Sequence, residues 1–329
     1  MIKVISALTL ILYSLNLFAD IGFNELEVKD KTRNRLLSTF IFYPSNDQTR
    51  ETFAENMVFY GFSASKGASV SKAKLPLFFL AHGTSGNWKN TTWLAKELAE
   101  NAIVVSANFP NYTSGQASPE SVLKPWDQAK DISFLIDTIL SSPYGKYIDQ
   151  NKIIVIGHSL GGYTAMALSG AIIDLKKYYE FCKINIDKSC MYFKGALEKL
   201  TVPNIEEAKH SLYDKRVKVA IAIAPGFTES MTQNSLKHLK TPILIISAEN
   251  DLNVPPKTHL LNIPRNIEQY QIKGSSHFSF LQVCKPNAKS ILAEEEAEFV
   301  CEDSGSKTRL DIHKEALKQI RLFLSKHDI

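Results

Sequence analysis

The sequence predicts an α/β fold with a mostly parallel central sheet and helices on both faces. From residue 77 onward, short apolar runs rich in β-branched residues alternate with longer segments of helical periodicity, and this alternation is typical of parallel strands joined by crossover helices. One apolar run ends in the glycine-flanked serine motif Gly157-His-Ser159-Leu-Gly161 and is followed by a helix-compatible stretch. Strand, tight turn and helix in that order are typical of a catalytic site at the carboxyl edge of such a sheet.

The expected elements follow in chain order. Residues 24–28 and 36–43 are expected to form an antiparallel pair, and the polar stretch 45–75 contains a strand-like piece at 57–62. The later pattern predicts strands at 77–82, 103–108, 153–157, 217–224, 243–248 and 267–272, and helices at 91–100, 127–140, 160–174 and 308–325. The last helix carries apolar residues at helical spacing, which predicts a core-facing stripe of Leu310, Ala316, Leu317, Ile320, Phe323 and Leu324.

Length and composition predict one α/β domain over residues 20–329, because 329 residues with 44% apolar content can bury a large core. The formal net charge is only +4, and no basic run is interleaved with aromatic residues. Nucleic acid is therefore not expected as a partner.

Residues 1–19 have the layout of a secretory signal peptide. Lys3 gives a positive start, Val4 to Leu17 an apolar core, and Leu17-Phe18-Ala19 a cleavage site before Asp20. Polar residues interrupt the apolar run, which favours a signal peptide over a spanning helix; an uncleaved anchor is the alternative. We expect an exported protein, periplasmic or secreted.

The serine motif predicts a nucleophile at Ser159. The turn is too tight for side chains at its flanks, so glycine is needed at 157 and 161. The following helix offers free N–H groups and a partial positive charge to an oxyanion. The alternative is an ordinary glycine-rich turn, which the flanking strand and helix disfavour.

A serine needs a base and an orienting acid, and in folds of this kind both follow it along the chain. The strand at 243–248 runs into a polar turn that carries Asp251, with Glu249 as the competing acid. His277 follows the strand at 267–272 in a loop, and it alone has the right place in the order. Of the other histidines, His82 and His158 belong to other motifs, and five are expected on the surface: His210, His238, His259, His313 and His327.

Two backbone donors are expected to receive the oxyanion. One is the N–H of Leu160, directly after the serine. The other comes from the loop after strand 77–82, where Thr84 follows His82-Gly83 and Ser85 is a weaker alternative. The competing interpretation is that His82-Gly83 forms only a strand-end turn.

These motifs together resemble the α/β-hydrolase superfamily, and within it the branch of predicted dienelactone hydrolases and platelet-activating-factor acetylhydrolase-like esterases. The matching segments span most of the chain after about residue 25: 76–83, 153–162, 217–225, 242–255, 274–281 and 301–323. True dienelactone hydrolases use a cysteine nucleophile, whereas position 159 is serine. The departure favours ordinary ester hydrolysis.

The four cysteines fall into two local pairs, Cys182/Cys190 and Cys284/Cys301. Four cysteines allow three connectivities; in an exported chain we expect the two local disulfides, and the resemblance agrees for the later pair. Free thiols are the alternative, while a metal site lacks the usual Cys and His spacing.

The stretch 175–216 interrupts the alternation and is expected to be an insertion. It holds Tyr178, Tyr179, Phe181, Tyr192 and Phe193, which either pack a small core of their own or form part of a cap over the site. A second aromatic group stands in and around the loops after strands 77–82 and 103–108, and some of its rings are candidates to line a substrate pocket: Trp88, Trp93, Phe109, Tyr112 and Trp126.

The sequence therefore predicts an exported serine carboxylic-ester hydrolase that works through an acyl-enzyme on a small-molecule or lipid ester, with no cofactor or metal. The resemblance implies short-acyl esters. Alternatives are a lipase or phospholipase on longer acyl chains, with lipid degradation as its role and contact with a membrane left open, a peptidase or amidase, and a non-catalytic binding protein that keeps the fold.

Overall fold

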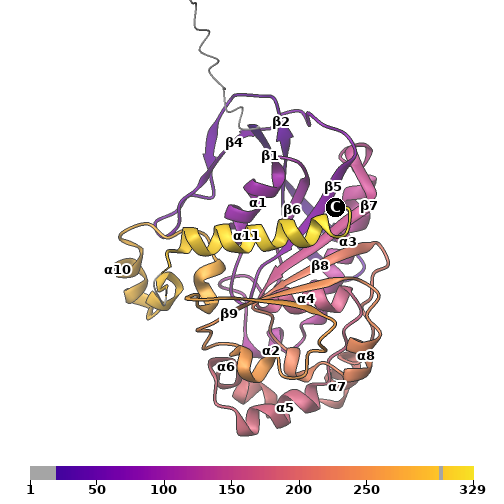
Figure 1. Cartoon of the computed structure of the whole chain (residues 1–329), viewed down its shortest axis with the longest axis vertical. Helices are drawn as coiled ribbons and strands as arrows, with labels where there is room; N and C mark the ends of the chain where they lie inside the picture. The colour runs from indigo at the N-terminus through magenta and orange to yellow at the C-terminus, as the bar shows by residue number, and fades with distance from the viewer. Residues whose placement is uncertain (1–19, 304–306) are drawn as a thin grey trace, which may run out of the picture.

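The computed structural model describes residues 20–303 and 307–329, where ten strands join in the order β10-β9-β8-β7-β5-β6-β2-β1-β4-β3 (Figure 1). The strands from β10 to β6 pair in parallel, and β2 and β1 extend the sheet as an antiparallel pair. The expected signal peptide, residues 1–19, lies outside the described residues. The strand bounds are β1 Asp20–Asp30, β2 Arg35–Ser45, β3 Glu51–Phe53, β4 Phe62–Lys66, β5 Leu75–Ala81, β6 Ile103–Asn108, β7 Ile148–His158, β8 Val217–Ile223, β9 Ile243–Ala248 and β10 Glu268–Ile272.

The four predicted helices correspond to α1, α3, α4 and α11, three further helices lie in the insertion, and four short ones lie elsewhere in the described residues. The α-helices are α1 Thr92–Ala99, α2 Pro119–Val122, α3 Trp126–Ser141, α4 Leu160–Leu168, α5 Leu175–Ile184, α6 Lys188–Leu197, α7 Val202–Glu207, α8 Gln233–Lys237, α9 Pro256–His259, α10 Ala288–Leu292 and α11 Arg309–Ser325. Short 3₁₀ turns are η1 Trp88–Thr91, η2 Gly145–Tyr147, η3 Thr228–Ser230, η4 His277–Phe280, η5 Ala293–Glu295 and η6 Glu298–Cys301.

Helices cover both faces of the sheet because successive strand residues point to opposite sides. In β5, Leu77 and Phe79 belong to the core that includes α3 and α4, whereas Phe78 and Leu80 belong to the core that includes α1 and α11. Figure 1 shows α11 crossing one face of the sheet beside α1. The predicted layered α/β architecture is confirmed.

Three predictions of local structure were wrong. The helix after Ser159 ends at Leu168 rather than 174, because Gly170 takes a left-handed φ of +107° and the N–H of Ala171 bonds back to the Met166 carbonyl at 3.0 Å. Residues 57–61 are not a strand of the sheet, since Phe59 instead bridges to Cys284. In α11 the predicted stripe is buried except for Leu310, which is 54% exposed.

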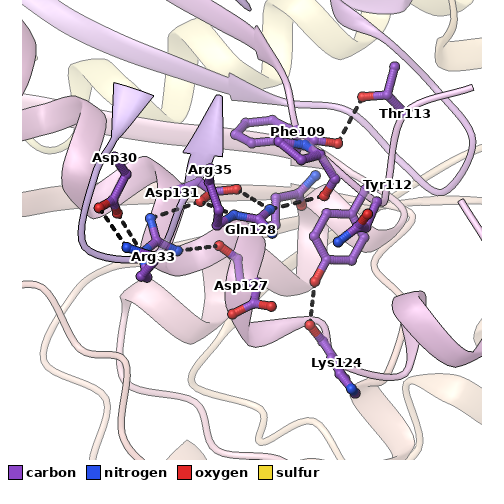
Figure 2. A network of polar contacts seen from close by, with 12 residues as sticks. Asp30, Arg33, Arg35, Phe109, Tyr112, Thr113, Lys124, Asp127, Gln128 and Asp131 are labelled. Carbon is purple, nitrogen blue, oxygen red and sulfur yellow. Dashed lines mark hydrogen bonds and ion pairs between the residues drawn. The ribbon is translucent and has the colours of Figure 1, made fainter. Parts of the chain in front are cut away.

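A buried polar network joins the β1–β2 hairpin to α3 (Figure 2). Figure 2 shows Arg33 and Arg35 pointing toward Asp131, with guanidinium–carboxylate distances of 2.8 and 2.6 Å. One turn earlier on α3, the Gln128 amide donates to the His82 carbonyl at 3.0 Å and accepts from the Thr164 hydroxyl at 2.6 Å. These bonds fix the loop after β5 relative to α3 and α4.

Candidate active site

Ser159 lies at a sharp turn between β7 and α4. Its backbone has φ 56° and ψ −117°, a left-handed conformation that costs free energy in a non-glycine residue. The surroundings hold it there, because the N–H of Ser159 donates to the Ile223 carbonyl at 2.9 Å and its carbonyl accepts from the N–H of Gly226 at 3.0 Å. The side chain remains partly exposed at the carboxyl edge of the sheet.

The two flanking glycines are required by close backbone contacts. A Cβ atom at Gly157 would lie 1.9 Å from the Gly161 carbonyl oxygen, and one at Gly161 would lie 2.0 Å from the Ala81 carbonyl oxygen. Both contacts are far inside van der Waals distance, so any side chain at either position would force the turn apart. The serine is thus presented by a turn that only this glycine pattern permits.

Asp251 and His277 meet beside this turn. Asp251 follows β9, His277 begins η4 after β10, and Nδ1 of His277 lies 2.7 Å from Oδ2 of Asp251. Both residues are buried. Within the described residues no hydrogen bond joins Ser159 to His277. Hydrogen bonds between catalytic groups often form fully only when substrate is bound.

The environment of Asp251 favours its ionised form. Burial works to raise its pKa, but the charge and hydrogen bond of His277 and the N–H groups of Val254 and Asn253, both at 2.8 Å from Oδ1, lower the pKa below its ordinary value. Glu249, the competing acid, is exposed and accepts instead from the N–H of Gly274 at 2.9 Å.

His158 supports the candidate base, a role that its place in the sequence does not indicate. Its Nε2 lies 2.9 Å from the carbonyl oxygen of His277, so Nε2–H donates, and the two rings are 4.8 Å apart. Burial, aided by the charge of His277, lowers the pKa of His158 to about 3, which keeps the ring neutral. Because His158 directly precedes Ser159, this hydrogen bond ties the two turns together.

The loop after β5 packs directly on the serine. A Cβ atom at Gly83 would lie 2.9 Å from Cβ of Ser159, so the Gly83–Thr84 backbone borders the site. The buried ring of His82 supports the loop: Nδ1–H donates to the Gly83 carbonyl at 2.8 Å, and burial lowers its pKa to about 4. On the other side, Leu160 begins α4, where the first N–H groups of a helix have no intrahelical partner.

The insertion touches the site's edge at two points. The N–H of Lys188 in α6 donates to the carbonyl of Leu252, next to Asp251, at 3.2 Å. Burial raises the pKa of Tyr192, and an interaction with the Ser85 side chain opposes that rise, which places Tyr192 beside the loop after β5. Among the insertion's aromatic residues, Tyr178 and Phe193 are buried and pack against Phe227, after β8.

A second buried histidine cluster fastens the insertion. Nε2 of His259 lies 2.9 Å from Asp187, the N-cap of α6, and Nδ1 lies 2.8 Å from Glu229 in η3. The Nδ1 contact is not aligned for a hydrogen bond and is ionic. Burial disfavours charge on His259, but the two carboxylates outweigh it and raise its pKa to about 9. The expectation that His259 lies on the surface was wrong, because its ring is buried within an ion cluster.

The same expectation was wrong for His313, which is buried and stacks on Trp93 at 3.9 Å between ring centroids. The five aromatic residues that were candidates for a substrate pocket are all buried: Trp88, Trp93, Phe109, Tyr112 and Trp126. Trp88, for example, stacks on Phe40 in the core with ring centroids 3.9 Å apart.

The structure contains both predicted disulfides, Cys182–Cys190 and Cys284–Cys301. The second closes a loop that returns to η4, where the Ser276 hydroxyl donates to the Glu302 carbonyl at 3.1 Å. Arg309 crosses this loop and donates to the carbonyls of Gln282 and Val300 at 3.1 and 2.8 Å. The chain around His277 is therefore braced from the C-terminal side.

In the part of the chain that the structure describes, no cluster of His, Cys, Asp and Glu is arranged to hold a metal ion. No helix of residues 20–303 and 307–329 is long and apolar enough to cross a membrane.

Comparison with known proteins agrees with this architecture. A model of the alpha/beta hydrolase family matches residues 78–284. A ferulic acid esterase from Streptomyces cinnamoneus is similar in structure, with a TM-score of 0.62 over 95% of this chain and 91% of that one, at 15% sequence identity. No curated protein matches the sequence. The predicted fold class is confirmed, and the narrower branch stays a prediction.

Proposed function

The chain belongs to the alpha/beta hydrolase family, and from this premise we propose that it is a serine carboxylic-ester hydrolase with Ser159 as nucleophile, His277 as base and Asp251 as orienting acid. The observation that carries the proposal is the 2.7 Å contact between Asp251 and His277 beside a serine held at φ 56°. Backbone strain and buried histidine–carboxylate pairs are concentrated at functional sites, and an ordinary glycine-rich turn does not require either.

In the proposed reaction, Nε2 of His277 accepts the hydroxyl proton as Oγ of Ser159 attacks the ester carbonyl carbon. Asp251 accepts from Nδ1–H of His277, which leaves the other ring nitrogen free to act on the serine, and the negative charge of Asp251 stabilises the imidazolium. His277 then protonates the departing alcohol oxygen. Water attacks the acyl-enzyme with His277 again as base, and the acid leaves.

The developing oxyanion would receive the main-chain N–H groups of Leu160 and Thr84. Leu160 supplies a donor at the start of α4, and the close packing of Gly83 on Ser159 supports the placement of Thr84. The Gln128 bond to the His82 carbonyl would keep this loop in position during the reaction.

We further propose that the insertion at 175–216 covers part of the site and limits the size of the acyl group. The Lys188–Leu252 bond and the Tyr192–Ser85 contact support this, because they join the insertion to loops that carry the proposed acid and oxyanion donor. The preferred substrates would then be short-acyl esters.

Export to the periplasm or the medium is part of the proposal. The layout of residues 1–19 and the two disulfides support it, since disulfides persist in oxidising compartments.

The test is labelling with a fluorophosphonate, which reacts only with an activated serine. We expect one label, on the peptide that contains Ser159, and none in Ser159→Ala. Ser114→Ala is the matched control, because Ser114 is an exposed serine outside the proposed triad. Unchanged labelling of Ser159→Ala, or no labelling of the parent protein, would contradict the proposed function.

The substrate class is tested with p-nitrophenyl esters from acetate to palmitate, together with p-nitroacetanilide and methyl ferulate. We expect kcat/KM to be highest for acetate or butyrate. A maximum at the long acyl chains would identify a lipase instead, and a preference for the anilide an amidase. Hydrolysis of methyl ferulate would show that this chain also acts on ferulic acid esters, the class named for its structural neighbour.

A further inference from the structure

A groove of about 870 Å³ lies between α1 and α11. These two helices belong to the layer that crosses one face of the sheet in Figure 1. None of Ser159, Asp251 and His277 lines the groove, so it is separate from the candidate active site. The volume falls within the range of pockets that enclose small organic ligands. None of the residues that line the groove takes part in the proposed reaction.

The floor of the groove is apolar and rigid. The Trp93 ring is buried, its Nε1–H donates to the Phe280 carbonyl at 2.8 Å, and His313 stacks on it at 3.9 Å with an interplanar angle of 7°. Burial and the nearby charge of Arg309 lower the pKa of His313 to about 3, so the ring is neutral. A floor fixed by hydrogen bonding and stacking is already formed before any ligand arrives.

The walls expose large apolar side chains. Leu310 and Leu322 of α11 are 54% and 50% exposed, and Tyr60 on the opposite wall is 45% exposed. Leu317 lies between them, buried, and continues the apolar surface. Single exposed leucines are common, but here they gather around one groove, and gathered apolar surface indicates a binding site.

The rim carries an excess of positive charge. Four cationic side chains line the groove against one carboxylate, Glu97, which lies 3.8 Å from Lys96 and 3.7 Å from Arg321. Within residues 20–303 and 307–329, Lys314 and Lys318 make no ion pair within 4 Å. The acids nearest to them on α11 are already engaged, since Asp311 caps the helix with Thr308 and Glu315 pairs with Lys307.

We propose that this groove binds a fatty-acid carboxylate, with the alkyl chain on the apolar floor and walls and the carboxylate at Lys314 and Lys318. An apolar trough rimmed by unpaired cations complements a single-chain amphiphile with one negative end. A neutral alcohol of the same length would lack the charged contact, and a cationic amphiphile would be repelled. Each additional buried methylene should strengthen binding by about fourfold until the groove is filled.

The experiment is calorimetric titration with dodecanoate below its micellar concentration. The full-length protein carries Ser159→Ala, so that the candidate active site cannot turn over an ester contaminant and the outcome does not depend on the proposed catalysis. We expect saturable binding of one dodecanoate. Dodecanol should bind more weakly by roughly tenfold, and dodecyltrimethylammonium should not bind.

The groove is assigned by two charge-reversal variants with the same net change. Lys314→Glu/Lys318→Glu should weaken dodecanoate binding by roughly tenfold or more. Lys176→Glu/Lys177→Glu, at exposed positions of α5 outside the groove, should leave it unchanged. Leu310→Ser/Leu322→Ser should also weaken binding, and thermal melts check that each variant folds.

The proposal is overturned if dodecanoate does not bind, if dodecanol binds equally well, if Lys314→Glu/Lys318→Glu binds like the parent, or if Lys176→Glu/Lys177→Glu weakens binding as much. Competition of dodecanoate with a fluorophosphonate at Ser159 in the otherwise unmodified protein, with no effect of Lys314→Glu/Lys318→Glu, would place the fatty acid in the active site instead. Failure of the proposed esterase function would not change any of these binding results.

Discussion

His277 and His259 are both buried histidines in contact with carboxylates, yet their surroundings differ in kind. His277 contacts one carboxylate, Asp251, and lies beside a partly exposed serine. His259 lies between two carboxylates, Asp187 and Glu229, in the interior. The two carboxylates hold the pKa of His259 at about 9, so at neutral pH it is a permanent cation.

The difference separates a candidate base from a structural ion. A base must be able to release its proton near neutral pH and must reach a reacting group. His259 meets neither condition, but it joins the insertion, through Asp187, to the loop after β8, through Glu229. A histidine–carboxylate contact therefore indicates catalysis only together with a nucleophile at its free nitrogen. Four experiments test whether the two histidines differ in this way.

The largest expected effect is on turnover. His277→Ala and Asp251→Asn should each lower kcat by roughly 10⁴-fold, and combining either with Ser159→Ala should add little, because the three groups act as a unit. Asp187→Asn is the matched control and should leave kcat within a few-fold. Ester hydrolysis at saturating substrate gives the values. Full activity of Asp251→Asn alongside an inactive Glu249→Gln would move the acid to Glu249.

The second effect is on stability. His259→Gln should lower the free energy of unfolding by about 3–5 kcal/mol, because two buried carboxylates lose their cation. Urea denaturation measures this, and the folded variant should keep a near-normal kcat. A variant of full stability, or one that is inactive while folded, would remove the distinction between the two histidines.

The third effect is on the pH dependence of stability. The pKa of His259 is raised from about 6.5 in the unfolded chain to about 9 in the folded protein, so its contribution is complete below pH 6.5 and is lost as pH rises through 9. The shift corresponds to about 3 kcal/mol. Denaturation at pH 6.5 and pH 9.5 should show this loss in the parent, and His259→Gln/Glu229→Gln should lack it. Equal pH dependence in both would contradict the assignment.

The smallest expected effect is the difference between the two disulfides. Each disulfide holds the segment that carries one of the two histidines or its partner. Cys284–Cys301 braces the segment of His277, whereas Cys182–Cys190 encloses Asp187, the partner of His259. Replacing the first pair with serine should cost about 3 kcal/mol and the second about 2.5 kcal/mol in the chain-entropy model. Activity at moderate temperature should fall more for the first pair. Thermal melts and ester assays measure both, and the reverse order of activity would contradict this pairing of disulfide and histidine.

Most strands and the serine turn could be predicted because each depends on residues that are adjacent in the sequence. Apolar runs mark buried strands, and the crowding around Ser159 shows in its own two glycines. The candidates Asp251 and His277 were chosen from chain order, and the structure brings their side chains within 2.7 Å of each other. His259 was misassigned because its partners come from α6 and η3, segments that no local pattern brings together. The groove depends on how α1 and α11 pack, which left Leu310 exposed at a position that periodicity alone assigns to the core.

The disulfides have one further consequence, for biogenesis. Each cysteine is bonded to its nearest neighbour along the chain, so the two loops are consecutive and do not interlock. A chain that enters an oxidising compartment from its N-terminus presents Cys190 well before Cys284, so the first bond can close before a wrong partner has arrived. If the protein is exported as proposed, its maturation should therefore need an oxidant but little disulfide isomerase, in contrast to chains whose bonds cross.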